Sequence, residues 1–218
     1  MTTDTTQTNQ KEQTIFNYIT NSIQTEDRDI KIIAKFEDPL IVVLGNVLSD
    51  AECDELIHLS KDRLQRSKIG DNREIHTIRT SSSMFFQDDE HPLIAKIEKR
   101  IASITTIPVE HAEGLQILNY KPGQEYKAHH DYFSPHSKAA NNNRISTLVI
   151  YLNEVEQGGE TFFPELNIAI SPQKGMAVYF EYFYQDETLN ARTLHGGAPV
   201  VRGEKWVATQ WMRKQKVR

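Results

Sequence analysis

The residues of this chain that are best suited to chemistry lie in the segment His129-His130-Asp131, and His195 and Lys205 join them much later in the sequence. His129 and Asp131 are separated by one residue, so on an extended segment their side chains point to the same face. His195 follows 66 positions after His129, and Lys205 follows ten positions after His195. Two imidazoles and one carboxylate on one face of an octahedral ion are typical of a non-haem Fe(II) oxygenase centre and leave three positions open. We therefore predict that His129, Asp131 and His195 are metal ligands and catalytic residues.

The remaining histidines lack this spacing. His130 adjoins His129 but faces the opposite way on a strand, so we do not expect it to bind the metal. The others are expected to be surface or packing residues, and they are His58, His76, His91, His111 and His136.

The composition is that of an ordinary globular protein. The chain has 218 residues, of which 38% are hydrophobic and 25% charged, enough for a full core in one or at most two domains. A net charge of −5 gives no reason to expect nucleic acid or an anionic membrane as a partner. No apolar run approaches the ~18 residues of a membrane-spanning helix, and the polar residues 1–10 lack the apolar region of a signal peptide. Together with a single cysteine, these features predict a cytoplasmic location.

The first half of the chain predicts helices and edge strands over residues 10–113, after a disordered tail rich in Thr, Gln and Asn over residues 1–9. Ile15, Ile19 and Ile23 recur at helical spacing and predict an amphipathic helix over 10–24. Its apolar stripe must be buried against the same domain or in a homodimer. Further helices are predicted over 49–64 and 92–105, and strands over 30–36, 40–44 and 80–86.

From residue 114 onward the texture changes to short strands separated by turns that contain Gly or Pro. The strands are predicted over 115–120, 126–129, 145–153, 161–163, 167–171, 177–181, 196–200 and 206–212. Such a series is typical of a sandwich or a jelly roll, which we place over 114–213. Helices early and strands late indicate an α+β arrangement with the helices supporting one sheet, in a single catalytic domain over 10–218. The polar segments 66–78 and 134–143 are predicted loops and candidate lids over the site.

Several segments resemble the prolyl 4-hydroxylase family. They are residues 115–120, Tyr126, His129-x-Asp131, Arg144-Ile-Ser-Thr147, Gly158-Gly-Glu-Thr161-x-Phe-Pro164, His195, Lys205-Trp206 and Trp211. The family consists of Fe(II)- and 2-oxoglutarate-dependent dioxygenases, so the resemblance implies a double-stranded β-helix, or jelly-roll, core. It covers residues 44–213 and looks most like the compact bacterial, Bacillus-type form.

The resemblance also implies the cofactors Fe(II), 2-oxoglutarate and O2, with ascorbate supporting activity. A buried carboxylate of the cosubstrate must be paired with a positive charge, which Lys205 can supply. Thr161 and Tyr120 stand at positions where the family donates hydrogen bonds to the cosubstrate. Three residues are candidates for the wall of the substrate site, where aromatic rings can embrace an apolar ring and a guanidinium can bind a peptide carbonyl: Tyr126, Arg144 and Trp211.

The function predicted in this way is hydroxylation of prolyl residues in a peptide or protein to 4-hydroxyproline, with release of succinate and CO2. A proline-rich or collagen-like chain would be the substrate. One alternative is a 2-oxoglutarate oxygenase that acts on a free small molecule. A closed pocket would favour this alternative, whereas an open groove would favour the peptide. Another is a non-catalytic metal-bound cupin or a peptide-binding module. The complete set of ligands together with Lys205 argues against this last alternative, because a pure binder has no need of cosubstrate residues.

Overall fold

The computed structural model describes residues 14–70, 74–183 and 191–218. The predicted disordered tail over 1–9 lies outside these residues. The helices and strands, in chain order, are β1 Ser22–Gln24, β2 Asp29–Glu37, β3 Leu40–Gly45, α1 Asp50–Ser60, β4 Gln65–Arg66, β5 Ser82–Phe85, α2 Pro92–Thr105, η1 Val109–His111, β6 Gln116–Tyr120, β7 Tyr126–His129, η2 Ala140–Asn142, β8 Arg144–Tyr151, β9 Gln157–Gly158, β10 Thr161–Phe163, η3 Pro164–Leu166, β11 Ile168–Ile170, β12 Ala177–Glu181, β13 His195–Gly197, β14 Val200–Arg202 and β15 Lys205–Arg213. None of the helices in the described ranges is long and apolar enough to cross a membrane.

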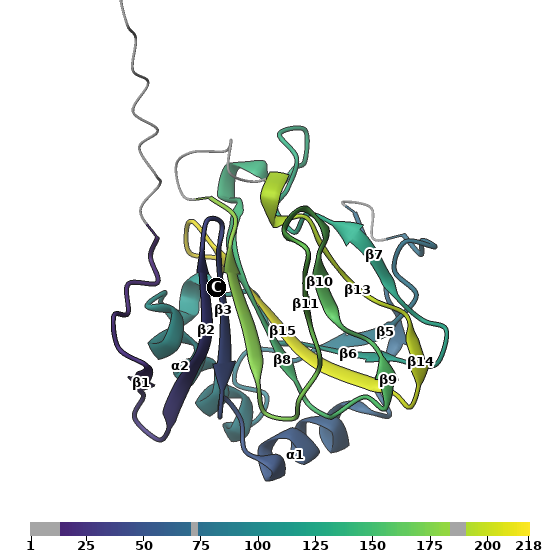
Figure 1. The fold of residues 1–218 in the computed structure, drawn as a ribbon, viewed down its shortest axis with the longest axis horizontal. Helices are drawn as coiled ribbons and strands as arrows, with labels where there is room; N and C mark the ends of the chain where they lie inside the picture. Colours follow the sequence, from purple (N-terminus) through teal and green to yellow (C-terminus); the bar gives the residue numbers. More distant parts are fainter. Residues whose placement is uncertain (1–13, 71–73, 184–190) are drawn as a thin grey trace, which may run out of the picture.

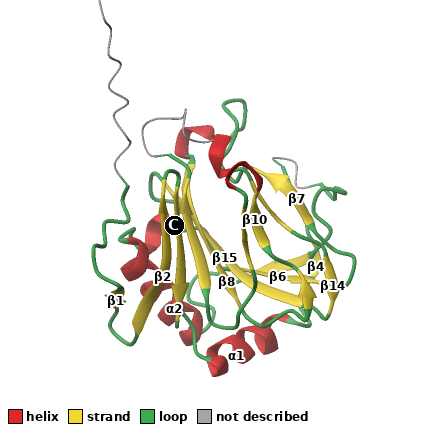
Figure 2. Ribbon diagram, viewed as in Figure 1, coloured by secondary structure: helices red, strands yellow, loops and turns green. Residues whose placement is uncertain are grey.

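A large, mainly antiparallel sheet forms the centre of the fold, with the strand order β1-β2-β3-β12-β8-β15-β6-β5-β4. The helices α1 and α2 lie against one side of it (Figures 1 and 2). The apolar side of α2, with Ile94, Ile97, Ile101 and Ile104, belongs to the same buried cluster as Leu148 from the middle of the sheet. The helices therefore cover one face of the sheet, as an α+β arrangement requires.

A second, smaller sheet with the order β11-β10-β13-β7 covers the other face of the large sheet (Figure 1). Strand β12 illustrates why both faces of the large sheet are apolar. Ala177 and Tyr179 pack on the helix side, while Val178 and Phe180 pack on the small-sheet side. Successive residues of a strand point to opposite faces, so a strand between two layers must be apolar throughout. This two-sheet arrangement confirms the predicted jelly-roll core with supporting helices.

Local signals account for the elements that were predicted closely. Helix α2 begins after His91, whose ring accepts a hydrogen bond from the backbone N–H of Leu93, and Pro92 occupies the first turn. It ends at Thr106, which has a left-handed φ of 59°. Helix α1 begins with the capping box of Ser49 and Glu52.

The predicted helix over 10–24 is wrong where the structure describes it. Residues 14–21 contain no helix, and β1 follows them. The side chain of Phe16 is fully buried and stacks on Tyr179, with 5.2 Å between ring centroids, and its backbone N–H donates to the carboxylate of Glu181. Ile19, in the middle of the expected apolar stripe, is 97% exposed. Anchoring of one aromatic residue in the core thus overrides the helical spacing, because tertiary packing outweighs local propensity.

Two further boundaries differ from the prediction. Helix α1 ends at Ser60 rather than Leu64, and the chain turns into the short edge strand β4. The strand expected over 196–200 is divided into β13 and β14, with Pro199 between them. Proline has no N–H to donate to a ladder, and the two strands have different neighbours, since β13 pairs with β7 and β10 while β14 pairs with β9.

Candidate active site

The two histidines of the predicted triad lie opposite each other in the small sheet. His129 ends β7, His195 begins β13, and the two residues are direct partners in the antiparallel ladder. The Nδ1 atom of His129 lies 2.9 Å from the carbonyl oxygen of Lys127, and that of His195 lies 3.0 Å from the carbonyl oxygen of Thr193. A carbonyl oxygen only accepts, so Nδ1 carries the proton in both rings and Nε2 keeps its lone pair. Both Nε2 atoms are therefore ready to bind a metal ion.

Asp131 places its carboxylate between these two rings. One oxygen, Oδ1, lies 3.1 Å from Nε2 of His129, and the other, Oδ2, lies 3.4 Å from Nε2 of His195. Oδ2 also accepts hydrogen bonds from the hydroxyl groups of Thr147, at 2.7 Å, and Tyr182, at 2.8 Å. Burial favours a higher pKa for Asp131, but the adjacent imidazoles outweigh it and hold the pKa well below its ordinary value. The carboxylate therefore lies within reach of both imidazole rings, as a shared metal site requires.

The three side chains form one cluster, in which the ligand atoms lie within 4.8 Å of one another. It is the only group of three or more His, Cys, Asp or Glu with this spacing among the described residues. His130 is not part of it, and its Nε2 lies 3.3 Å from the carbonyl oxygen of Ala191 instead. Burial and the neighbouring His195 lower the pKa of His129, which favours the neutral ring that a metal needs. Two neutral imidazoles and one carboxylate fit Fe(II).

Aromatic side chains shield this cluster. The ring of Tyr126 stacks on that of His129 with 3.5 Å between centroids, and Phe180 lies against His195 at 4.5 Å. Phe163 packs against the same histidine at 5.8 Å. Since Phe163 and Phe180 are fully buried, water has little access to the cluster from the core side.

Lys205 is a buried cation without a paired anion in the described part of the chain. It is only 4% exposed, and its Nζ atom lies 5.7 Å from the ring centroids of both Tyr120 and Tyr151. A side chain placed on Gly197, in the same strand as the second histidine, would begin 3.6 Å from this Nζ. Burial lowers the pKa of Lys205 to about 8, although Glu160 opposes the shift. An ammonium group held in this way favours a bound anion.

Thr161 and Tyr120 complete the surroundings of Lys205 from two different sheets. Tyr120 pairs with Lys205 in the large sheet, and Thr161 pairs with Gly197 in the small sheet. The hydroxyl of Tyr151 donates to Oγ1 of Thr161 at 2.8 Å, so the hydroxyl proton of Thr161 remains available for another acceptor. The structure thus brings together the three residues that were predicted to bind the cosubstrate.

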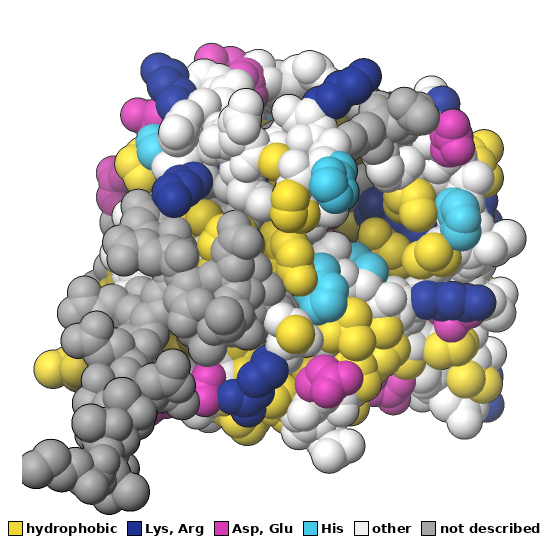
Figure 3. Space-filling view, turned by 90° about the horizontal axis from the view of Figure 1, so that it is seen from above, with side chains coloured by type: hydrophobic (Ala, Val, Ile, Leu, Met, Phe, Trp, Pro, Cys, Tyr) yellow, Lys and Arg dark blue, Asp and Glu magenta, His cyan; other side chains and the backbone are white. Residues whose placement is uncertain are grey.

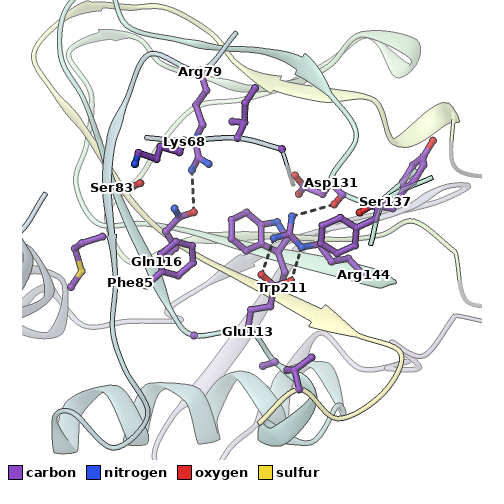
Figure 4. A pocket seen from close by; sticks show the side chains of 18 of the residues that line it. Lys68, Arg79, Ser83, Phe85, Glu113, Gln116, Asp131, Ser137, Arg144 and Trp211 are labelled. Atoms are coloured by element: carbon purple, nitrogen blue, oxygen red, sulfur yellow. Dashed lines mark hydrogen bonds and ion pairs between the residues drawn. The ribbon is translucent and has the colours of Figure 1, made fainter. Parts of the chain in front are cut away.

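A cavity of about 1850 Å³ opens next to the cluster of His129, Asp131 and His195. It is lined by Tyr126 and, as Figure 4 shows, by Asp131 and Trp211, among others. Seen from above, this part of the molecule shows histidine and apolar side chains around a hollow (Figure 3). Trp211 is largely buried below the surface of the cavity. Tyr126 and Trp211, the two aromatic residues of the predicted substrate wall, thus both line this cavity.

Arg144 also borders the cavity, but its donors are already in use. Its Nε and Nη2 atoms form a bidentate pair with the carboxylate of Glu113, at 2.7 and 2.8 Å, and Nη1 donates to the backbone oxygen of Asp131 at 3.2 Å. The guanidinium lies 3.9 Å above the ring of Trp211 (Figure 4). Arg213 binds the same Glu113 carboxylate, with its Nε 2.6 Å from Oε1. The geometry therefore favours Arg144 as a support for Trp211 and Asp131 over the predicted donor to peptide carbonyls.

Arg79 lines the cavity and was not among the predicted site residues. It is 5% exposed, its Nη2 donates to Oε1 of Gln116 at 3.0 Å, and its Nε has no hydrogen-bond partner within the described ranges. Its guanidinium also lies 4.9 Å from the ring centroid of Tyr126. A buried donor without a partner is rare in a folded protein and is explained if a ligand fills it. A signal was present in the sequence, because the segment Arg79-Thr80-Ser81-Ser82 resembles a strand of the prolyl 4-hydroxylase family that borders the peptide groove.

Known proteins resemble this chain over the residues that carry the site. Residues 115–213 match the family described as the 2OG-Fe(II) oxygenase superfamily. The chain is 39% identical to prolyl 4-hydroxylase 2 of Arabidopsis thaliana over an alignment of 202 residues, and the match covers 80% of this chain and 67% of the plant protein. Among solved structures, the viral collagen prolyl hydroxylase of Paramecium Bursaria Chlorella virus-1, in its 2OG complex, is 34% identical. It superimposes with a TM-score of 0.68 over 80% of this chain and 96% of the viral chain.

A more distant structure shares the fold alone. The prolyl hydroxylase of Trichoplax adhaerens, in complex with a peptide fragment of the hypoxia inducible factor, is 17% identical. It covers 79% of this chain and 82% of its own, with a TM-score of 0.63.

Proposed function

This chain belongs to the prolyl 4-hydroxylase family of 2OG-Fe(II) oxygenases, and we propose that it hydroxylates prolyl residues of a peptide or protein to 4-hydroxyproline. The observation that carries the proposal is the cluster of His129, Asp131 and His195 beside the unpaired ammonium of Lys205. A protein that only binds a metal does not need a buried cation at this place. An enzyme that binds a dicarboxylate does, because the buried carboxylate must be paired with a positive charge.

The proposed metal is Fe(II), held by Nε2 of His129, Nε2 of His195 and one oxygen of Asp131. When bound together with 2-oxoglutarate and O2, it supplies the oxidation that inserts oxygen into a C–H bond and yields succinate and CO2. Lys205 is proposed to pair with the far carboxylate of 2-oxoglutarate. Thr161, whose proton is free because Tyr151 donates to its oxygen, would add a hydrogen bond.

The substrate is proposed to be a proline-rich or collagen-like chain lying in the cavity. Such chains are biased toward polyproline II and forfeit little conformational entropy on binding. Tyr126 and Trp211 would contact the prolyl ring, and the free Nε of Arg79 would donate to a backbone carbonyl of the chain. Arg144 would hold Trp211 in place from behind. The size of the cavity favours a peptide over a free small molecule.

Other properties are proposed on the resemblance and composition of the sequence: support of activity by ascorbate, a cytoplasmic location and a homodimer. The compact bacterial, Bacillus-type form likewise rests on the sequence, since the relatives described above come from a plant, a virus and an animal. The catalytic unit is proposed to span residues 10–218.

Mass spectrometry tests the proposed function. Proline-rich and collagen-like peptides are incubated with the protein, Fe(II), 2-oxoglutarate and ascorbate. We expect each modified peptide to gain the mass of one oxygen atom, located on proline, with an equal amount of succinate. Free proline serves as the competing substrate. Succinate without any hydroxylated peptide, or faster turnover of free proline, would contradict the peptide assignment.

A further inference from the structure

The two oxygens of the Asp131 carboxylate have unequal surroundings. Oδ2 accepts hydrogen bonds from two hydroxyl groups, those of Thr147 and Tyr182, at 2.7 and 2.8 Å. Oδ1 accepts from no hydroxyl group among the side chains that the structure describes. Each oxygen also lies near one imidazole, Oδ1 at 3.1 Å from Nε2 of His129 and Oδ2 at 3.4 Å from Nε2 of His195. A carboxylate oxygen offers about two lone pairs, so Oδ2 is saturated while Oδ1 is not.

The two hydroxyl donors come from neighbouring strands of the large sheet and are held rigidly. Thr147 lies on β8, where it pairs with Phe180 of β12, and Tyr182 follows directly after the end of β12. Thr147 is fully buried and Tyr182 is 2% exposed, so neither side chain has room to turn away. Both are positioned by the core rather than by the loop that carries Asp131.

We infer that Thr147 and Tyr182 are positioning residues that reserve Oδ2 and present Oδ1 alone to the metal. Asp131 would then bind through one oxygen only. The inference rests on the proposed function, because it assigns a task to side chains around the proposed iron and 2-oxoglutarate site. It explains why two donors meet at one oxygen when an even distribution would satisfy the carboxylate equally well.

The number of coordination positions gives this restriction its importance. Two imidazoles and one carboxylate oxygen leave three positions of an octahedral ion open. A chelating keto acid takes two of them and O2 takes the third. If Asp131 bound through both oxygens, it would occupy one of these positions and compete with the cosubstrate.

Cobalt(II) provides a redox-inert probe of this restriction. The double variant Thr147→Val with Tyr182→Phe removes both hydroxyls and keeps the shapes of the side chains. In its cobalt form we expect a changed visible absorption spectrum, which reports coordination number, and weaker binding of 2-oxoglutarate. Losing such outer hydrogen bonds typically costs about 10- to 100-fold in metal affinity or activity, and we expect a loss of similar size in 2-oxoglutarate affinity. Titration calorimetry of the cobalt form measures the binding.

Matched variants separate positioning from packing. Tyr179→Phe removes the hydroxyl of a fully buried tyrosine in β12, the strand that Tyr182 follows. That hydroxyl donates to Glu181 and not to Asp131. We expect this variant to keep the spectrum and the affinity of the unaltered protein. Thr147→Ser retains a hydroxyl donor and should behave likewise. Tyr182→Phe alone should shift both readouts part of the way, which keeps the test open if the double variant does not fold.

The outcomes distinguish this inference from the proposed function. If the unaltered protein binds neither cobalt(II) nor 2-oxoglutarate, the proposed function fails. If the unaltered protein binds both, and the spectrum and the 2-oxoglutarate affinity of the Tyr182→Phe and double variants equal those of the unaltered protein, the inference is overturned and the two hydroxyls only fill the core.

Discussion

At the scale of single residues, hydrogen bonds decide which atom of each side chain in the site is left for a ligand. Carbonyl oxygens accept hydrogen bonds from the Nδ1–H groups of His129 and His195. In the neutral rings both Nε2 atoms are therefore left with free lone pairs. The hydroxyl of Tyr151 donates a hydrogen bond to the hydroxyl oxygen of Thr161, so the hydroxyl proton of Thr161 remains available for a ligand. The site is thus prepared for a metal and an anion before either arrives, which is how an active site avoids reorganisation.

Asp131→Ala should abolish turnover and weaken Fe(II) binding, because it removes the only anion of the cluster and leaves two neutral imidazoles. His130→Ala should keep most activity, since that ring lies against the backbone of Ala191. Metal titration and succinate release measure both effects. Loss of metal in the His130 variant as complete as in the Asp131 variant would show that the ligands are wrongly assigned.

Lys205→Met should weaken 2-oxoglutarate binding far more than peptide binding. Loss of one partner from a buried ion pair costs about 3–5 kcal/mol, or roughly two to three decades in affinity. Lys174→Met is the matched control, because Lys174 pairs with the largely exposed Asp54 at the surface. An unchanged 2-oxoglutarate affinity in the Lys205 variant would refute its role.

The same lysine predicts a pH dependence. Because burial lowers the pKa of Lys205 to about 8, the free protein loses this positive charge as the pH rises through about 8. Only the charged form pairs with the carboxylate, so the affinity for 2-oxoglutarate should be constant below this pH. Above it, the affinity should fall by about tenfold per pH unit, with proton uptake on binding. Calorimetry in buffers of different ionisation enthalpy measures both quantities, and Lys205→Met should show neither.

At the scale of elements, one guanidinium joins the two helices to the strands. Arg100 of α2 donates to both carboxylate oxygens of Glu52 in α1, at 3.0 and 2.7 Å. It also donates to Oδ1 of Asp27 at 3.0 Å and to the backbone oxygen of Val47 at 2.9 Å. Burial favours a higher pKa for Glu52, but the hydrogen bonds from Arg100 and from the N–H of Ser49 outweigh it and lower the pKa to about 2.

Arg100→Met should lower the free energy of unfolding by about 3 kcal/mol at pH 7, because it removes a buried cation and leaves the half-buried Glu52 and the more exposed Asp27 without their main partner. A carboxylate with a lowered pKa stabilises the fold above its unfolded pKa of about 4.5, and this contribution is lost as the pH falls through about 2. In the variant the pKa of Glu52 moves back up, so the difference between the two proteins should narrow below pH 4.5.

Urea unfolding at pH 7 and at low pH measures this difference. Arg202→Met is the control, since Arg202 and Glu156 form an ion pair in which both side chains are more than half exposed. Such surface pairs contribute about 1 kcal/mol or less. A destabilisation of Arg100→Met that does not exceed the control, or that does not change with pH, would contradict the proposed coupling of the helices.

At the scale of the whole molecule, the cavity joins residues from both sheets and from the loops between them. Ser83 and Phe85 line the cavity from β5, near the edge of the large sheet, and Tyr126 lines it from β7 of the small sheet. Arg79 forms an antiparallel bridge with Tyr126, and Asp131 follows β7. A chain lying along the cavity would contact both sheets. Lys205 is not among the residues that line the cavity, so the proposed contacts to the substrate and to the cosubstrate involve different side chains.

Arg79→Met should lower peptide hydroxylation and leave 2-oxoglutarate binding unchanged. A hydrogen bond from a charged group contributes about 1.5–3 kcal/mol, or roughly one to two decades in kcat/KM for the peptide. Lys68→Met is the control, because Lys68 borders the same cavity but is exposed. Equal losses in the two variants would show that general positive charge, and not the free Nε of Arg79, attracts the substrate.

The features that depend on near neighbours in the chain can be read from the amino-acid sequence. The spacing of His129 and Asp131 places both on one face because a strand alternates with period two. The apolar spacing and Pro92 predicted α2 at its observed bounds. The jelly roll followed from the series of short strands and from the resemblance to the prolyl 4-hydroxylase family. These properties are local in origin or are contained in the motifs themselves.

Which side chains already have a partner and which remain free depends on contacts between distant parts of the chain. Arg144 is taken by Glu113, 31 positions away, and Tyr182 reaches Asp131 across 51 positions. Phe16 enters the core beside Tyr179 and prevents the helix that its neighbours favour. These contacts depend on strand order, since β12 lies between β3 and β8 although they are far apart in the chain. Pairing and burial across such distances arise from the assembled sheets, and the local pattern of residues does not contain them.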